Sequence, residues 1–345
     1  MSVEVSAPPL ARPGGQGRNS AVAPVLEVAR NPILRVIVRR LLMAIPLLFV
    51  VSGLSFLLVS LTPGDAAREI LGLNAPPGAY PKLRAALGLN LPLYTQYWHW
   101  VEHAVQGNFG TSLFTDQSVS SAISQRLPVT FSLMIGALVI STVVGVALGV
   151  FSAVRGGAVG RAVDGFSLVG FALPSFWVGA GLIAVFAVKL GWFPAIGYVS
   201  LGQSVSEWFK SLVLPWVALS LGGIAAISKQ TREAMLEVLA SEHVRMGWAN
   251  GLSARSIFFK HALKNASLRV VTMIGLHAVG LLGGTVLVEN VFALPGLGSL
   301  IVNASIQHDL PIVEGVAVYF TVLVVAINLL TDIAYSWLNP RVRAQ

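Results

Sequence analysis

The stretch LPVTFSLMIGALVISTVVGVALGVFSAV, residues 127–154, decides the class of fold. It holds no Asp, Glu, Lys or Arg over 28 consecutive residues, between Arg126 and Arg155. An α-helix crosses the hydrocarbon core of a bilayer with about 20 apolar residues. The stretch therefore predicts a transmembrane helix, and the next question is how often the pattern recurs.

Five further charge-free runs are strongly apolar and hold 17 to 24 residues each. They cover residues 41–64, 165–188, 211–228, 270–288 and 315–331. The bounding charged side chains of the shorter runs can snorkel to the headgroups. The 345 residues are 55% hydrophobic and 11% charged, which is too apolar for a soluble domain. We predict an all-α, polytopic membrane protein with six transmembrane helices, at about 38–62, 128–154, 164–189, 211–230, 270–290 and 314–337.

The remaining segments differ in composition from these helices. Residues 1–34 are rich in Pro, Gly and Ser without an apolar period, which predicts a disordered cytoplasmic tail rather than a signal peptide. Residues 35–343 form the transmembrane domain. It has long polar segments at 63–127 and 229–269 and a loop at 291–313. The absence of cysteine excludes a disulfide framework, a thiol nucleophile and a cysteine-based metal site.

The positive charges fix the predicted orientation. With the N-terminus in the cytoplasm, 17 of the 23 Lys and Arg residues fall on the inside and six on the outside. The positive-inside rule therefore places both termini and residues 229–269 in the cytoplasm, and residues 63–127 and 291–313 outside. Orientation in the membrane also explains the net charge of +8 without nucleic acid.

The sequence lacks the usual motifs of several activities. No lysine follows a glycine, so no P-loop for ATP is present, and neither HExxH nor Gly-x-Ser-x-Gly occurs. His277 is the one titratable residue in the charge-free runs and is predicted to be a hydrogen-bonded packing residue. Two alternatives remain but are disfavoured. A secondary transporter or channel needs buried charges, which these runs lack. A membrane scaffold or intramembrane enzyme is the other. If the chain transports a solute, the energy must come from elsewhere.

The polar segment 229–269 contains RMGWANGLSARSIFFKHALKN, residues 245–265, with four cationic side chains and no acid. Ser241 is predicted to cap a short helix through Asn250, which Gly251 ends in a left-handed conformation. Ser253 then caps a second, basic amphipathic helix. Its predicted apolar face contains Ile257, Phe258, His261 and Ala262. Such a helix could also lie on a membrane surface.

The sequence GLSARSIFFKHALKN resembles the EAA loop of ABC-importer permeases, in particular the dipeptide/oligopeptide permease family. Seven other stretches carry the resemblance across residues ~35–343. They are LxxxIPxLxxVSxxSFxLxxLxPGD at residues 41–65, LGLNLPLYTQYWxW, GNFGTSL with RLPVTFSL, FALPSFWVG, VENVFALPGLG at residues 288–298, and NLLTDIAYSWLNPRVR.

The resemblance implies a type I ABC-importer permease fold in a bacterial inner membrane. The chain would form half of the translocation pathway of an ATP-driven importer of short peptides, or of glutathione, a nickel chelate or an oligosaccharide. Its implied partners are a second homologous permease, two ABC ATPase subunits and an extracytoplasmic substrate-binding protein. ATP and Mg would be held by the ATPase subunits, and this chain would be no enzyme and would bind no cofactor or metal.

The resemblance also assigns candidate site residues. Those expected to couple to the ATPase subunits are Glu242, His243, Val244, Arg245, Met246, Gly247, Asn250, Gly251, Leu252, Ser253, Arg255 and His261. Candidates for an extracytoplasmic gate are Glu289, Pro295, Gly296 and Gly298.

The sequence departs from the family pattern at three places. The EAA element begins Arg245-Met246-Gly247, so its acidic residue is missing and a glycine replaces alanine, at a cost of roughly 1 kcal/mol of helix stability. Leu268-Arg269 stands where the family often has Ile-Pro, which leaves the entry into the fifth span open. PGDAA follows the first span in place of PGDP. The substrate branch of the family stays open for these reasons.

Overall fold

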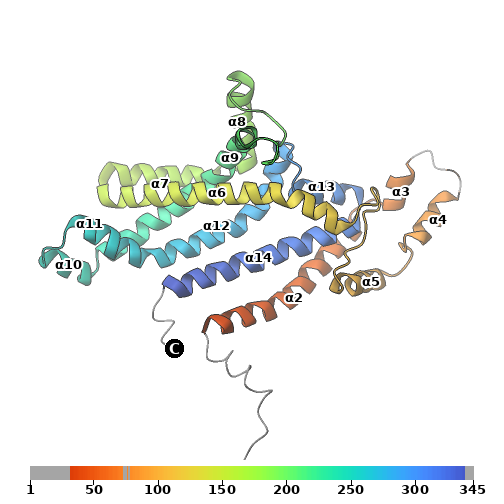
Figure 1. The fold of residues 1–345 in the computed structure, drawn as a ribbon, viewed down its shortest axis with the longest axis horizontal. Helices are drawn as coiled ribbons and strands as arrows, with labels where there is room; N and C mark the ends of the chain where they lie inside the picture. The colour runs from red at the N-terminus through yellow and green to blue at the C-terminus, as the bar shows by residue number, and fades with distance from the viewer. Residues whose placement is uncertain (1–31, 73–75, 77, 339–345) are drawn as a thin grey trace, which may run out of the picture.

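The computed structural model describes residues 32–72, 76 and 78–338, and within them the chain is helical with no strand. The prediction of an all-α protein is therefore confirmed for this part of the chain. The predicted tail, residues 1–34, lies almost entirely outside the described residues, as do Arg341 and Arg343. The molecule is elongated, with its long helices running roughly along one axis (Figure 1).

Five helices are long and apolar enough to cross a membrane. They are α2 (Pro32–Leu61), α6 (Val119–Arg155), α9 (Val205–Leu239), the helix Ala254–Val291 that ends in α12 (Lys264–Val291), and α14 (Leu310–Leu338). Most extend beyond the predicted spans. α6 begins at residue 119 because Ser118 caps it, its Oγ accepting from the Ser121 amide. α9 continues nine residues past the predicted end at 230.

The third predicted span, 164–189, is wrong as a single helix. It consists of α7 (Gly157–Ala172) and of α8 (Ser175–Leu182) with its π-helical continuation Ile183–Lys189, and the two parts meet at 96°. Pro174 has no amide hydrogen and holds Leu173 in an extended conformation, which ends α7. The predicted six spans are thus five long helices and one bent pair.

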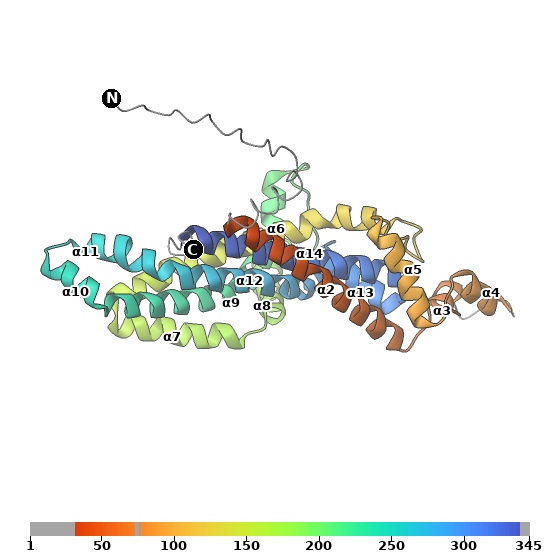
Figure 2. The same cartoon turned by 90° about the horizontal axis from the view of Figure 1, so that it is seen from below.

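The polar segments gather at opposite ends of the long axis. The helices α3 (Ala66–Leu71), α4 (Ala79–Ala86) and α5 (Leu93–Val105) lie at one end (Figures 1 and 2). The helices α10 (Glu242–Ala249) and α11 (Ala254–Ser256) lie at the other. Between these ends, α13 (Leu297–Gln307) occupies the segment that was predicted to be a loop.

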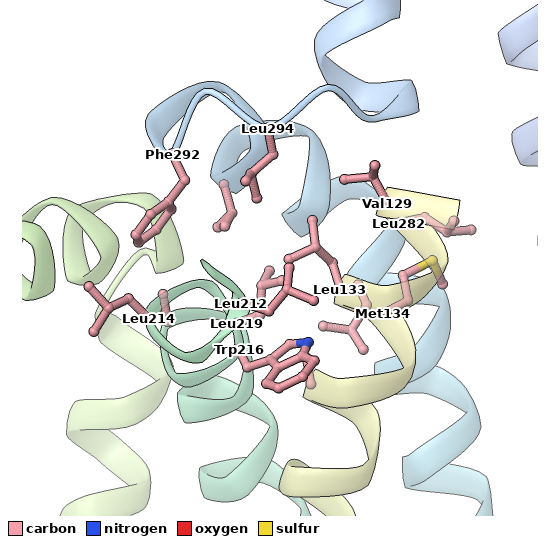
Figure 3. Close-up of a cluster of buried hydrophobic side chains, with 14 residues drawn as sticks. Val129, Leu133, Met134, Leu212, Leu214, Trp216, Leu219, Leu282, Phe292 and Leu294 are labelled. Carbon is pink, nitrogen blue, oxygen red and sulfur yellow. The ribbon is translucent and has the colours of Figure 1, made fainter. Parts of the chain in front are cut away.

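The main apolar core joins α6, α9 and α12 (Figure 3). Leu133 from α6, Leu212 from α9 and Leu281 from α12 are each at most 3% exposed. Phe292 and Leu294, from the turn after α12, insert into the same cluster. The core therefore fixes the turn after α12 to the body of the molecule.

Small residues set the closest helix contact, between α6 and α9. A Cβ atom added at Gly145 would lie 2.9 Å from Ile227 Cβ, and one at Gly149 would lie 2.5 Å from Thr231 Cβ. Glycine at these positions lets the two backbones approach, as in other membrane helix pairs.

Replacing Gly149 by alanine is expected to lower the melting temperature of the detergent-purified chain by several degrees. The added methyl group has no space, and overpacking of this kind costs about 1–3 kcal/mol. Gly280→Ala is the matched control, because nothing lies within 4 Å of its Cβ position. Differential scanning fluorimetry of both variants checks the difference, and equal melting temperatures would contradict the packing assigned to Gly149.

Candidate functional site

The short helix α10 forms where the sequence predicts it, at the far end of the molecule. It begins at Glu242 and ends at Ala249, and the Asn250 amide donates to Met246 O at 2.9 Å. Gly251 follows with φ +76°, the left-handed conformation that ends the helix. The predicted side-chain cap at Ser241 is wrong, because its hydroxyl donates to the Val238 carbonyl instead.

Most of the predicted residues on α10 face away from the protein. Val244 is the anchor, with 2% exposure. A Cβ atom added at Gly247 would lie 3.2 Å from Leu252 Cδ1. Glu242, His243, Arg245, Met246 and Asn250 are exposed, and so are Gly251 and Leu252. The helix therefore presents a free polar and apolar surface. Trp248, 47% exposed, belongs to this surface and was not predicted.

The chain returns from α10 through one continuous helix. The predicted Ser253 cap is present, with Oγ accepting from the Ser256 amide at 3.4 Å. From Ala254 the helix runs through a π-helical segment, Ile257–Leu263, into α12. The helix therefore enters the fifth span without interruption, which answers the question left open by Leu268-Arg269.

The buried face of this returning helix differs from the prediction. Ile257 and Ala262 are at most 1% exposed, but His261 is exposed, as is Arg255. The wider π-helical turn shifts the register, so that spacing by an ordinary α-helix places His261 wrongly. The structure therefore leaves His261 on the surface beside α10.

Two contacts hold together the helices on either side of α10, which are α9 and the helix Ala254–Val291. Arg269 of α12 forms a two-pronged ion pair with Glu237 of α9, with Nη2 at 2.7 Å from Oε1. Beneath it, Met235 and Ala262 pack together in a small cluster of buried residues at 0% exposure. The two helices that flank α10 are thus held to each other close to where it begins and ends.

At the other end of α12, Glu289 joins three elements. It is fully buried near the end of α12, and its Oε1 accepts from Thr130 Oγ1 of α6 at 2.7 Å. Its Oε2 accepts from the Ser299 amide at 3.0 Å, in the first turn of α13. Thr130 Oγ1 also accepts from the Leu297 amide at 2.9 Å. The carboxylate and the hydroxyl together satisfy amides that a helix start leaves unpaired. We call Glu289, Thr130 and the start of α13 the outer latch.

The two glycines predicted for the gate are part of the outer latch. A Cβ atom at Gly296 would lie 2.2 Å from Glu289 Cδ, and one at Gly298 would lie 2.4 Å from Val286 Cα. Both positions therefore exclude any side chain. Pro295 is exposed at the turn and does not contribute to the hydrogen bonds. The structure thus brings together three of the four predicted gate residues.

Sequence reasoning missed two further residues at this end. Thr130 lies inside the charge-free run 127–154, which was predicted only to be a transmembrane helix. Asp309, 3% exposed, accepts from Ser112 Oγ at 2.5 Å and from the Leu113 amide at 3.2 Å, and so ties the segment after α5 to the start of α14. Burial raises the pKa of Asp309, and these hydrogen bonds oppose that shift. Thr130 belongs to RLPVTFSL, one of the stretches that carry the family resemblance, but the resemblance assigned it no role. Asp309 belongs to none of the quoted stretches.

His277 has the role predicted for it. Its Nε2 lies 3.1 Å from Ser141 Oγ across the interface between α12 and α6. A Cβ atom at Gly223 of α9 would lie 2.1 Å from the same nitrogen. The ring therefore packs among three helices with a hydrogen-bond partner.

Comparisons with known proteins cover almost the whole chain. Residues 145–344 match the model of a family described as binding-protein-dependent transport system inner membrane component, and residues 33–134 match the N-terminal model of such components. The chain is 44% identical over 308 residues to a probable peptide ABC transporter permease of Sinorhizobium fredii, covering 89% of this chain and 98% of that protein. A putative peptide transport system permease of Brucella abortus is 40% identical over the same shares. The glutathione transport system permease of Escherichia coli K12 is 37% identical, covering 90% and 99%.

Replacing Thr130 by valine is expected to destabilise the outer latch. The change keeps the shape but leaves the Leu297 amide and one Glu289 oxygen without this partner, and each buried unpaired group costs about 1–3 kcal/mol. Melting temperature and limited proteolysis of the segment after α12 measure the effect.

The matched control is Thr272→Val in α12, which is exposed and bonds only to the Leu268 carbonyl of its own helix. It should leave both measurements unchanged. If the two variants behaved alike, the hydrogen bonds of Thr130 would have no part in holding α13.

Proposed function

Because the chain belongs to the family of binding-protein-dependent transport system inner membrane components, we propose that it is a permease subunit of an ATP-driven importer of short peptides. The observation that carries the proposal is α10, a short exposed helix between α9 and the long helix Ala254–Val291, which ends at the outer latch. Family membership sets aside the secondary transporter and the intramembrane enzyme. The two peptide permeases at 44% and 40% identity support peptide as the cargo. Glutathione, itself a short peptide, is the alternative supported by the relative at 37%.

We infer four partners from the proposed role. Two ABC ATPase subunits hydrolyse ATP with Mg, and one of them receives α10 of this chain. A second, homologous permease completes the translocation pathway, and a substrate-binding protein delivers the cargo at the α3–α5 end. In the proposal this chain binds no nucleotide, and the ATPase subunits move it.

The proposed orientation places α10 in the cytoplasm of a bacterial cell and α3–α5 outside its inner membrane. The distribution of Lys and Arg supports this orientation. The start of α2 and the end of α14 lie on the α10 side of the molecule, and Arg40 of α2 pairs there with Asp332 of α14 at 2.5 Å (Figures 1 and 2). Both termini are therefore cytoplasmic in the proposal.

The proposed mechanism is alternating access driven from α10. The helix Ala254–Val291 has 38 residues, which corresponds to a length of about 57 Å. It begins beside α10 and ends at the outer latch, so movement of α10 with the ATPase subunits displaces the outer turn as well. Glu289, Gly296 and Gly298 then act as the attachment through which α12 moves α13. Because the turn is fixed by hydrogen bonds, it follows the helix instead of unfolding.

Uptake of labelled peptides by cells carrying the complete transporter tests the function. Deleting this chain should abolish uptake of at least one of a dipeptide, a tetrapeptide and glutathione, and vanadate, which blocks ABC ATPases, should have the same effect. Uptake that depended on the proton gradient and resisted vanadate would contradict the proposal. The peptide that competes best defines the cargo class.

Gly251→Val is expected to disrupt the contact with the ATPase subunits, and with it transport, while the protein still inserts into the membrane. A β-branched side chain resists the left-handed φ of +76°, so the end of α10 must rearrange. Peptide uptake, ATPase activity and co-purification of the ATPase subunits should all fall.

The control is Gly202→Val. Gly202 is an exposed glycine in the turn before α9, with open space around its Cβ position and no left-handed φ. This variant should keep normal values in the three assays. Normal uptake by the Gly251 variant would remove α10 from the coupling role.

A further inference from the structure

A cavity of about 370 Å³ opens between α2 and α14 at their α10-side ends. Two turns of α2, from Val36 to Met43, contribute to its wall, and one turn of α14 closes it. Its lining residues are Val36, Arg39, Arg40, Met43, Asp332, Tyr335 and Ser336. It lies away from α10 and from the outer latch, and neither the family comparison nor the coupling mechanism gives it a role.

The charges of this cavity do not cancel. Arg40 uses Nε and Nη2 to bind both oxygens of Asp332, at 2.5 and 3.0 Å. Arg39 takes part in no ion pair among the described residues, nor does Arg35 one turn earlier. Two arginines and one aspartate leave the cavity with a net positive charge, and Arg35 adds to it. An anion is the complementary ligand.

The hydrogen-bonding groups favour a phosphate. A guanidinium has five N–H donors, so the two that Arg40 gives to Asp332 leave three for a ligand. The pairing with Asp332 also holds the guanidinium in place, which reduces the entropy lost on binding. Arg39 and the Tyr335 hydroxyl add further donors. Planar guanidinium groups suit the oxygens of a phosphate particularly well.

An apolar surface continues from the cavity along α2. Below Met43, which lines the cavity, Leu47, Val50 and Leu54 follow at spacings of four, three and four residues. Their exposed fractions are 40%, 56% and 54%. Helical spacing of this kind places them in one stripe on the same side of α2. A cationic cavity at the head of an apolar stripe matches a molecule with a phosphate at one end and a hydrocarbon chain at the other.

We propose that this cavity binds the phosphate headgroup of an anionic phospholipid, with one acyl chain along the α2 stripe. The site lies at the inner leaflet if the proposed orientation is correct, which is where basic cavities between transmembrane helices meet anionic headgroups. The bound lipid joins α2 to α14 beside the Arg40–Asp332 pair.

Native mass spectrometry of the assembled transporter in detergent tests the proposal. Dioleoylphosphatidylglycerol is titrated as the anionic probe, with dioleoylphosphatidylcholine and inorganic phosphate at matched concentrations. Phosphatidylglycerol should bind more tightly than phosphatidylcholine. Arg39→Gln should weaken the binding of phosphatidylglycerol about fivefold, because one cation near a membrane surface contributes about 1 kcal/mol to the attraction of an anionic lipid.

Arg161→Gln in α7 is the control, because Arg161 is exposed, forms no ion pair among the described residues and lies outside the cavity. Arg40 is left unchanged because it ties the two helices. Equal binding of the two lipids, or equal weakening by both variants, would overturn the proposal. Displacement of phosphatidylglycerol by inorganic phosphate would assign the cavity to a free anion instead.

Peptide uptake by the same preparations in liposomes reports the transport function independently. A transporter that bound no lipid selectively but imported peptide would refute only the lipid site. One that bound the lipid at the cavity but imported no peptide would refute only the proposed function.

Discussion

The constraint on which this structure depends is that backbone amides and carbonyls find no water in the core of a membrane. Long uninterrupted helices meet the constraint directly. Each place where the backbone departs from a helix needs partners from elsewhere in the protein. At the start of α13, Glu289 and Thr130 provide them, and the buried carboxylate is tolerated there because amides and a hydroxyl surround it. The same hydrogen bonds that make the turn possible also make it stiff.

The helix Ala254–Val291 can transmit a movement because contacts hold it firmly at both ends. At the α10 end it is held to α9 by Arg269 and Glu237 and by the apolar cluster around Met235. The ion pair itself is exposed and contributes little stability, so the packing beneath it is the stronger contact. At the other end, the turn after α12 is fixed in the main core by Phe292 and Leu294. A movement at one end is therefore transmitted instead of being absorbed by a loop.

The helical fold could be predicted from the sequence because strongly apolar runs of 17 to 28 uncharged residues have few other solutions. The bend at Pro174 was not predicted, since a proline inside an apolar run either kinks a spanning helix or ends it, and neighbouring helices decide which. The position of α10 could be predicted, because Gly251 after a short helix-forming segment defines a helix end. The exposure of His261 could not be predicted, since no residue pattern indicates the π-helical segment before α12. Thr130 was likewise missed, because its partner is 159 residues away in the chain.

Arginine at position 269 has a geometric consequence. A proline there would introduce a flexible joint where the fifth span begins, and the helix could bend at that point. In this chain the helix passes through residue 269 unbroken, so its natural motion is to tilt as one piece. For a rod of about 57 Å, a rotation of about 10° carries the far end sideways by about 10 Å, which exceeds the width of a peptide backbone. A modest swing on the α10 side is enough to open or shut a passage of that width.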